Sequence, residues 1–255
     1  MLVAATLLLA PRLLQFAEIS TTLVAWPWQF DYDEGINLNA AVQLSEGRNI
    51  YSHNGPDGFL SAPYPPLLYI ATAPLAWLAG PELWPGRAIS LLATLAIATL
   101  IFYIVRRVTG IWGAGLFAGA LWLSLSPVIV WSALYKQDMP ALALGLAGLA
   151  CALRRPAGRG VYVAAILFAL AFMTKQSALA PAAATGLWLM LRDPRWGLRL
   201  LAALILLIPL PVLLGTLFTG GGLWEHLVTN HSTAWSIGQF ESTLRPLMNE
   251  YWPLL

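Results

Sequence analysis

The sequence has 255 residues, of which 58% are hydrophobic and only 10% are charged. Soluble domains carry about 25% charged residues, so this composition excludes a soluble globular protein and predicts a polytopic membrane protein. The net charge of +2 is scattered among apolar segments, which gives no indication of nucleic-acid binding. The single cysteine, Cys151, excludes an intrachain disulfide.

Apolar runs predict the helices in chain order. They cover residues 2–24, 65–79, 86–105, 111–132, 139–153, 161–173, 178–191 and 198–218, and a last run opens near Pro246 and is cut off at Leu255. No basic region precedes the first run and no A-x-A site follows it, so we interpret it as a retained helix and not as a signal peptide. Run 65–79 contains three prolines and is shorter than the about 20 residues of a crossing, which predicts a re-entrant or surface-lying segment. We therefore expect an all-α transmembrane protein with about seven spans plus a truncated one.

Charge separates the predicted loops into two sets. One set carries eight of the 14 basic residues and a single acid, Asp193. These basic residues are Arg106, Arg107, Arg154, Arg155, Arg159, Arg192, Arg195 and Arg199. Arginine clusters in short loops mark the cytoplasmic side of a membrane. The other set, with ten of the 12 acids and all three histidines, is predicted to face outward from a prokaryotic-type plasma membrane.

The first acidic cluster lies in FDYDEGINL, residues 30–38. Asp33 stands where the N-cap of a short amphipathic surface helix is expected, and Gly47 ends that helix. In the simpler interpretation Asp33 caps the helix and Glu34 complements its dipole. In the functional interpretation Asp33 and Glu34 are candidate catalytic carboxylates.

Two further motifs place charges within the membrane boundary. In YKQDMPALAL, residues 135–144, Asp138 precedes a run of 15 residues that spans about 22 Å, less than the bilayer core. In AFMTKQSALAP, residues 171–181, Lys175 joins two runs that are each only about 20 Å long, beside Gln176 and Ser177. A submerged ionisable residue is a functional candidate. Lys175 is expected to contact an anionic ligand, to pair with Asp138, or to extend to the interface.

Two acids and one lysine at one depth predict a phosphate site that could also hold a cation. Asp33 and Asp138 offer the oxygen ligands that Mg²⁺ or Mn²⁺ prefers, and Lys175 offers a point charge to a phosphate. Further along, the stretch 220–235 carries His226, Asn230 and His231. Their spacing is a weak zinc signal, and solvated loop residues are the equal alternative.

The DE pair of the first outer loop, YPPLLY at 64–69, DMP at 138–140 and TKQS at 174–177 resemble, in this order, the GT-C class of integral-membrane glycosyltransferases. The similarity is to the family 39 and RgtA/B/C/D-like group, which is related to the protein O-mannosyltransferases and the lipid A aminoarabinose transferases. It covers residues 30 to 180, the N-terminal conserved part of such enzymes. Members are about twice as long, so we expect residues 1–255 to be part of a longer transmembrane glycosyltransferase.

The resemblance implies inverting transfer of a hexosyl or pentosyl group from a polyprenyl-phosphate donor to an acceptor hydroxyl of a lipid, glycan or protein. By analogy Asp33 is the general base, Asp138 helps to hold the site or a divalent metal, and Lys175 meets the donor phosphate. Tyr64, Gln176 and His231 are candidate substrate-binding residues. The aminoarabinose transferases carry lysine at the position of Tyr64, which favours RgtA/B/C/D-like members.

Two other classes compete with a glycosyltransferase. A transporter or flippase for an anionic lipid or lipid-linked sugar would also require a submerged lysine, but it usually shows internal repeats and midplane charges, and this sequence shows neither. A structural membrane subunit without chemistry does not explain the polar groups gathered on one side.

Overall fold

The computed structural model describes residues 2–55, 59–231 and 236–251, and this part of the chain is helical, with no β-strand. The α-helices are α1 (Leu2–Leu7), α2 (Ala10–Ala25), α3 (Tyr32–Ser45), α4 (Leu67–Ala79), α5 (Trp84–Thr109), α6 (Trp112–Ser124), α7 (Ser126–Trp131), α8 (Asp138–Arg154), α9 (Arg159–Thr174), α10 (Ala180–Arg192), α11 (Pro194–Leu207), α12 (Pro209–Phe218), α13 (Gly222–Leu227) and α14 (Ile237–Tyr251). A 3-10 helix, η1, covers Thr229–His231. The predicted all-α fold is therefore confirmed for these residues.

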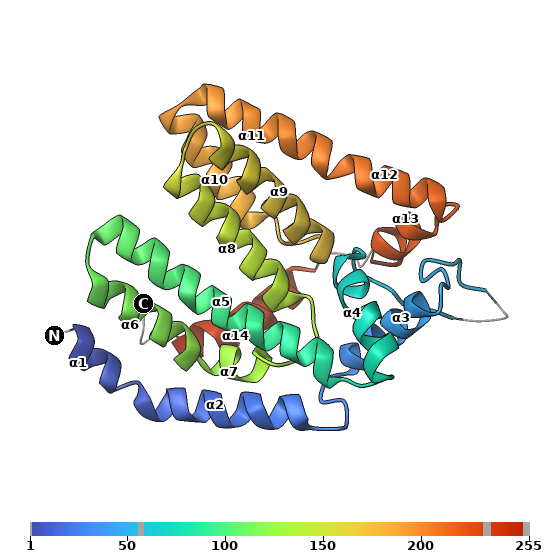
Figure 1. The fold of residues 1–255 in the computed structure, drawn as a ribbon, viewed down its shortest axis with the longest axis horizontal. Coiled ribbons are helices and arrows are strands. Elements are labelled where there is room, and N and C mark those ends of the chain that lie inside the picture. The colour runs from blue at the N-terminus through green and yellow to red at the C-terminus, as the bar shows by residue number, and fades with distance from the viewer. Residues whose placement is uncertain (1, 56–58, 232–235, 252–255) are drawn as a thin grey trace.

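A bundle of helices forms the body of the protein (Figure 1). Helix α8 packs against α5 and α9, and α11 packs against α9 and α10. Small residues permit the close approach, because a Cβ atom on Gly148 would lie 2.6 Å from the Phe168 ring. Phe168, Leu189 and Leu200 are fully buried between these helices. The short predicted runs 139–153, 161–173 and 178–191 thus become α8, α9 and α10, close to their predicted bounds.

Three predicted runs are each broken into two helices. Run 2–24 becomes α1 and α2, run 111–132 becomes α6 and α7, and run 198–218 becomes α11 and α12. A proline occupies the first turn of each second helix, at Pro11, Pro127 and Pro209. Proline has no amide hydrogen to donate and disfavours the helical conformation in the preceding residue, so the hydrogen-bond ladder is interrupted there.

Two stretches are long and apolar enough to cross a membrane, Trp84–Thr109 and Pro194–Phe218, in the part of the chain that the structure describes. The predicted count of seven spans therefore stays a prediction. Helix α4 has only 13 residues with Pro74 inside it and packs on α3, and its predicted re-entrant character likewise stays a prediction.

The charged residues gather at opposite ends of the bundle. The C-terminal ends of α5, α8 and α10 and the N-terminal ends of α9 and α11 lie together and carry the eight arginines of the basic loops, whereas α3, α4 and α13 gather at the other end (Figure 1). This arrangement matches the separation expected from the sequence.

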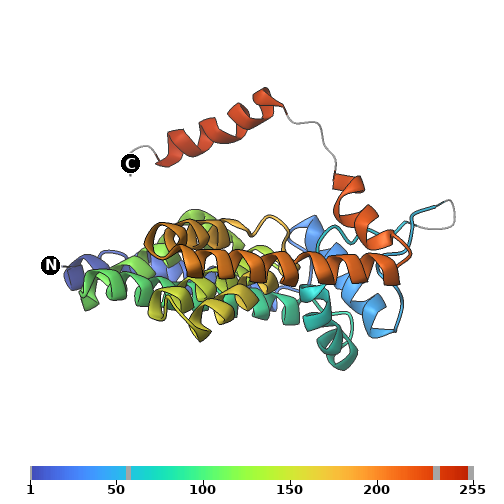
Figure 2. The same ribbon diagram turned by 90° about the horizontal axis from the view of Figure 1, so that it is seen from above.

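Helix α14 differs from the prediction for the C-terminal region. It begins at Ile237, nine residues before the predicted apolar run, and contains Pro246. Its apolar side chains Ile237, Phe240 and Leu244 are exposed, and the helix stands apart from the bundle in Figure 2. The end of the predicted run, residues 252–255, lies outside the described residues.

Candidate active site

The first turn of α3 is built by a capping box. The Asp31 side chain accepts a hydrogen bond from the Asp33 amide at 3.0 Å, and the Glu34 carboxylate accepts one from the Asp31 amide at 3.4 Å. The predicted N-cap, Asp33, is therefore wrong by two residues. A capping box requires an acceptor and a glutamate three positions apart, and Asp31 with Glu34 meets this spacing. Asp33 is released from capping and is 7% exposed.

Glu34 forms a fully buried ion pair with Arg87 of α5. The guanidinium donates at 2.8 Å to each carboxylate oxygen, and Oε1 also accepts from the Tyr135 amide at 3.0 Å. Burial alone would raise the pKa of Glu34, but these hydrogen bonds hold it below its usual value. Both carboxylate oxygens of Glu34 accept hydrogen bonds from Arg87 or the backbone, so the position of Glu34 gives no support to a catalytic role.

Arg87 was not predicted as a site residue from the sequence, although a charged residue inside the apolar run 86–105 is itself a sign of a functional or structural role. Its guanidinium also donates to the backbone oxygens of Leu23 at 2.6 Å and Trp28 at 2.8 Å. One buried cation thereby joins the end of α2, the start of α3 and α5. It sets the position of the loop that carries the acidic cluster.

Lys136 is the second cation that sequence reasoning missed. Its Nζ lies 3.0 Å from Asp31 Oδ1 and 2.8 Å from Asp33 Oδ2, and 4.4 Å from the centre of the Trp131 ring. Burial would lower the pKa of Lys136, but the two carboxylates raise it overall. Burial acts in the opposite sense on Asp31, whose pKa the Lys136 ammonium and the Asp33 amide lower overall. The lysine stands two residues before Asp138 in YKQDMP, but only the fold brings it to α3.

Amide side chains fix the segment 135–138 on α3. Asn37 donates through Nδ2 to the Tyr135 carbonyl at 2.7 Å and accepts from Gln137 Nε2 at 2.7 Å. All three residues are buried. The buried face of α3 is thus polar over its first turns, which differs from the predicted amphipathic surface helix. The consequence is a rigid connection between the acidic cluster and the start of α8.

Asp138 and Lys175 form the second ion pair of the site. Lys175 Nζ lies 2.6 Å from Asp138 Oδ1 and 5.6 Å from the centre of the Tyr64 ring. Pairing with Asp138 was one of the alternatives left open for Lys175. Gln176, next in the chain, donates to the Pro63 carbonyl at 3.1 Å, and its buried Oε1 has no hydrogen-bond partner among the described residues.

Tyr64 connects the two ion pairs electrostatically. Burial raises the pKa of its hydroxyl to about 12, and the negative charges of Asp33 and Asp138 add to this shift. Lys175 contacts both Asp138 and the Tyr64 ring, and Lys136, two residues before Asp138, contacts Asp33. The structure brings Asp33, Asp138, Lys175 and Tyr64 into one region at the end of the bundle opposite the arginine clusters.

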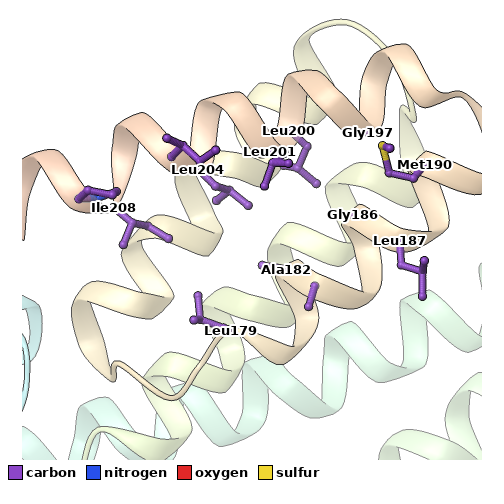
Figure 3. Close-up of a pocket in the computed structure, with 13 residues that line it drawn as sticks. Leu179, Ala182, Gly186, Leu187, Met190, Gly197, Leu200, Leu201, Leu204 and Ile208 are labelled. Carbon is purple, nitrogen blue, oxygen red and sulfur yellow. The ribbon is translucent and has the colours of Figure 1, made fainter.

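An apolar groove of about 530 Å³ opens beside the second ion pair. Asp138 and Lys175 contribute to its wall, and the other lining residues are mostly apolar side chains of α6, α7, α8 and α10, among them Trp122, Trp131, Leu142 and Pro181. A second apolar cavity of about 470 Å³ lies between α10 and α11 (Figure 3). Its lining includes no charged residue, so only the first groove combines an apolar surface with an ammonium group.

The predicted histidines fall elsewhere. His226 is 2% exposed and both its ring nitrogens lie within hydrogen-bond distance of backbone atoms, so it is neither a solvated loop residue nor a free metal ligand. The side chain of His231, predicted to bind substrate, lies outside the described residues. The described residues contain no group of three or more His, Cys, Asp or Glu side chains that could hold a metal ion.

Comparison with known proteins adds one finding. Residues 63–217 match the model of the dolichyl-phosphate-mannose-protein mannosyltransferase family, which covers Tyr64, Lys136, Asp138 and Lys175 but not the acidic cluster at 31–34. Neither the search of curated proteins nor that of solved structures finds a significant match. Glycosyltransferase activity of the mannosyltransferase type is the function that this family implies. Because the match extends over more than half of its residues, the chain belongs to the dolichyl-phosphate-mannose-protein mannosyltransferase family.

Proposed function

We propose that this protein transfers a sugar from a polyprenyl-phosphate donor to an acceptor hydroxyl, with inversion at the anomeric carbon. The observation that carries the proposal is the Asp138–Lys175 pair in the wall of an apolar groove. A lipid-phosphate substrate presents an anionic head and an apolar tail. A lysine beside an apolar surface is complementary to both parts.

Lys175 is assigned to the donor phosphate. Its ammonium now contacts one carboxylate oxygen, and it is about one quarter exposed, so a phosphate could join or replace Asp138 as its partner. The leaving group is a phosphate, which requires charge stabilisation more than a strong general acid. The donor's isoprenoid chain would occupy the groove formed by α6, α7, α8 and α10.

Asp33 is assigned as the general base on the acceptor hydroxyl. A positioned carboxylate within hydrogen-bond reach can accept the proton that the hydroxyl loses. Lys136 holds one oxygen of Asp33 at 2.8 Å, and the Asn37–Gln137 contacts fix Lys136 in turn. Because a buried polar atom without a partner is rare, the free Oε1 of Gln176 is assigned to a sugar hydroxyl.

A divalent cation fits poorly between the predicted ligands. Asp33 and Asp138 are each paired with a lysine, at 2.8 and 2.6 Å. A Mg²⁺ or Mn²⁺ ion at either carboxylate would have to displace an ammonium group or lie close to one, which like charge disfavours. We therefore assign charge stabilisation to Lys175.

The proposed orientation places the site at the outer face of a prokaryotic-type inner membrane. Arginines at the opposite end of the bundle support it through the positive-inside tendency. Single-cysteine labelling in intact cells tests this orientation. Positions 107 and 33 should react from opposite sides, and labelling of both from one side would contradict the topology.

The activity is tested with the full chain reconstituted in lipid vesicles and given polyprenyl phosphates that carry a labelled sugar. We expect label to move to an acceptor, and both Asp33→Asn and Lys175→Ala to reduce transfer by at least about a hundredfold. Asp193→Asn is the matched control, because this carboxylate caps α11 at the opposite end of the bundle and asparagine caps equally well.

Two results would count against the proposal. Full sugar transfer by Asp33→Asn would exclude Asp33 as the general base. The alternative function, a transporter or flippase, would be indicated if the labelled lipid moves between leaflets without any sugar product. This movement would then be lost in Lys175→Ala and unchanged in Asp33→Asn.

A further inference from the structure

A buried histidine connects α13 to the loop that leads into the site. His226 Nδ1 lies 3.2 Å from the Ala62 amide nitrogen, and Nε2 lies 2.9 Å from the Ser52 carbonyl oxygen. Its ring also meets the Tyr51 ring edge to face, with centroids 5.8 Å apart. A single side chain from α13 therefore contacts both ends of the loop between residues 51 and 62.

These contacts lead directly to Tyr64 and Lys175. The Tyr51 hydroxyl donates to the Tyr64 carbonyl at 2.7 Å, and Gln176 donates to the neighbouring carbonyl, that of Pro63, at 3.1 Å. Ala62, which donates to His226, is the residue before Pro63. The backbone of 62–64 is thus held by α13 on one side and by the Lys175–Gln176 turn on the other.

The packing around His226 is close. A Cβ atom on Gly222 would lie 1.7 Å from the Tyr51 carbonyl oxygen. Leu223 and Leu227 of α13 are buried in one cluster with Tyr51, Leu60 and Ala62, and Tyr64 packs against it. Helix α13 therefore packs directly against residues 51, 60 and 62 of the loop.

We propose that His226 is a positioning residue for sugar transfer, which in its neutral form holds Tyr64 and the Pro63 carbonyl against the Lys175–Gln176 turn. This inference rests on the proposed function only for its catalytic consequence. The contacts themselves can be tested without any sugar donor.

The two backbone partners specify one tautomer. The Ala62 amide is a donor, so Nδ1 must accept, and the Ser52 carbonyl is an acceptor, so Nε2 must carry the proton. A second proton on Nδ1 would direct an N–H group at the Ala62 N–H. The neutral tautomer therefore satisfies both backbone partners, and removal of the ring leaves the Ala62 amide without its acceptor.

The charged and titratable groups around His226 come from three elements. Glu225 precedes it on α13, and the hydrogen bond with His53 holds the pKa of this carboxylate below its usual value. His53 of the loop contacts Glu225 and the Gly220 carbonyl, and the hydrogen bond to Glu225 is the largest cause of its raised pKa. Tyr51 of the loop and Tyr69 of α4 belong to the adjoining cluster. Glu225 is paired with His53 on the surface.

Hydrogen exchange of the full chain in lipid nanodiscs tests the positioning role. Protection of the amides in 59–66 is measured in the natural protein at pH 8. His226→Leu removes both hydrogen bonds and should lower this protection by about tenfold or more at pH 8. His226→Asn places an amide oxygen near the position of Nδ1, so it should keep most of the protection.

His53→Gln is the matched control, because it removes an exposed contact from the same loop and leaves His226 intact. It should keep the protection of 59–66 at pH 8 within about threefold. Transfer of labelled sugar should follow the exchange results, with His226→Leu impaired and His226→Asn largely active.

Several results would overturn the inference. They are unchanged protection of 59–66 in His226→Leu, loss confined to 222–231, or a loss in His226→Asn as large as that in His226→Leu. Normal sugar transfer by a His226→Leu protein with a loosened loop would show a structural role only. If the natural protein transfers no sugar at all, the proposed function fails, and the exchange data still decide whether His226 holds the loop.

Discussion

Replacement of Arg87 by methionine should be among the most damaging single substitutions in the protein. Methionine fills a similar volume but donates no hydrogen bond. The change leaves the Glu34 carboxylate buried without its cation, and the carbonyl oxygens of Leu23 and Trp28 lose their donor. Both side chains of the ion pair are 0% exposed, so water cannot take the place of the guanidinium.

The magnitude follows from this burial. Removal of one partner from a buried ion pair costs about 3–5 kcal/mol. For a chain of this size each kcal/mol lowers Tm by about 2–4 °C, so Arg87→Met should melt about 6–20 °C below the natural protein. Glu34→Gln keeps an acceptor for the Tyr135 amide and should be milder. The double variant should cost less than the sum of the two single changes, because no unpaired charge is then left in the interior.

Thermal unfolding of the purified protein in detergent, followed by tryptophan fluorescence, measures these shifts. Arg106→Met is the control, because this arginine lies on the same helix, α5, but is exposed, and its change should stay within about 0.5 kcal/mol. An Arg87→Met protein that melts within about 2 °C of the natural one would refute the reasoning. Strict additivity in the double variant would also contradict a coupled ion pair.

Three further predictions concern the acidic cluster and Tyr64. Asp33→Asn should reduce sugar transfer by about 10²–10⁴-fold in the vesicle assay. Its Tm should fall only slightly, since Lys136 keeps Asp31 as a partner. A large loss of Tm would instead indicate a structural role for Asp33. The free energy of unfolding should fall in acid, because the folded-state pKa values of Asp31 and Glu34 lie below their ordinary values. The stability that these two groups contribute is present above their ordinary pKa values and is lost as pH falls through the folded-state values. Denaturant titrations between pH 6 and 3 that show no loss would contradict this prediction. Tyr64→Phe should change sugar transfer by less than about tenfold, because the Lys175 ammonium lies over the ring and phenylalanine preserves that contact. A larger loss would assign a role to the Tyr64 hydroxyl.

Local features of the sequence were sufficient for the class and much of the helix plan. The lengths of the apolar runs predicted α8, α9 and α10. Such a prediction is possible because helix formation depends mainly on residues that are close in the sequence. The arginine clusters predicted which helix ends lie together, and the short runs before and after Lys175 placed this lysine near Asp138. The breaks at Pro11, Pro127 and Pro209 could also have been read locally, since each proline stands at the start of a new helix.

The partners of the buried charges were decided only by the tertiary structure. Arg87 meets Glu34 across 53 positions, Lys136 meets Asp31 across 105, and His226 meets Ala62 across 164. Nothing in the local sequence of either member specifies such a contact. It forms because the packing of α3, α5 and α13 buries these groups side by side, and a buried charge or polar atom is stable only where a partner replaces water.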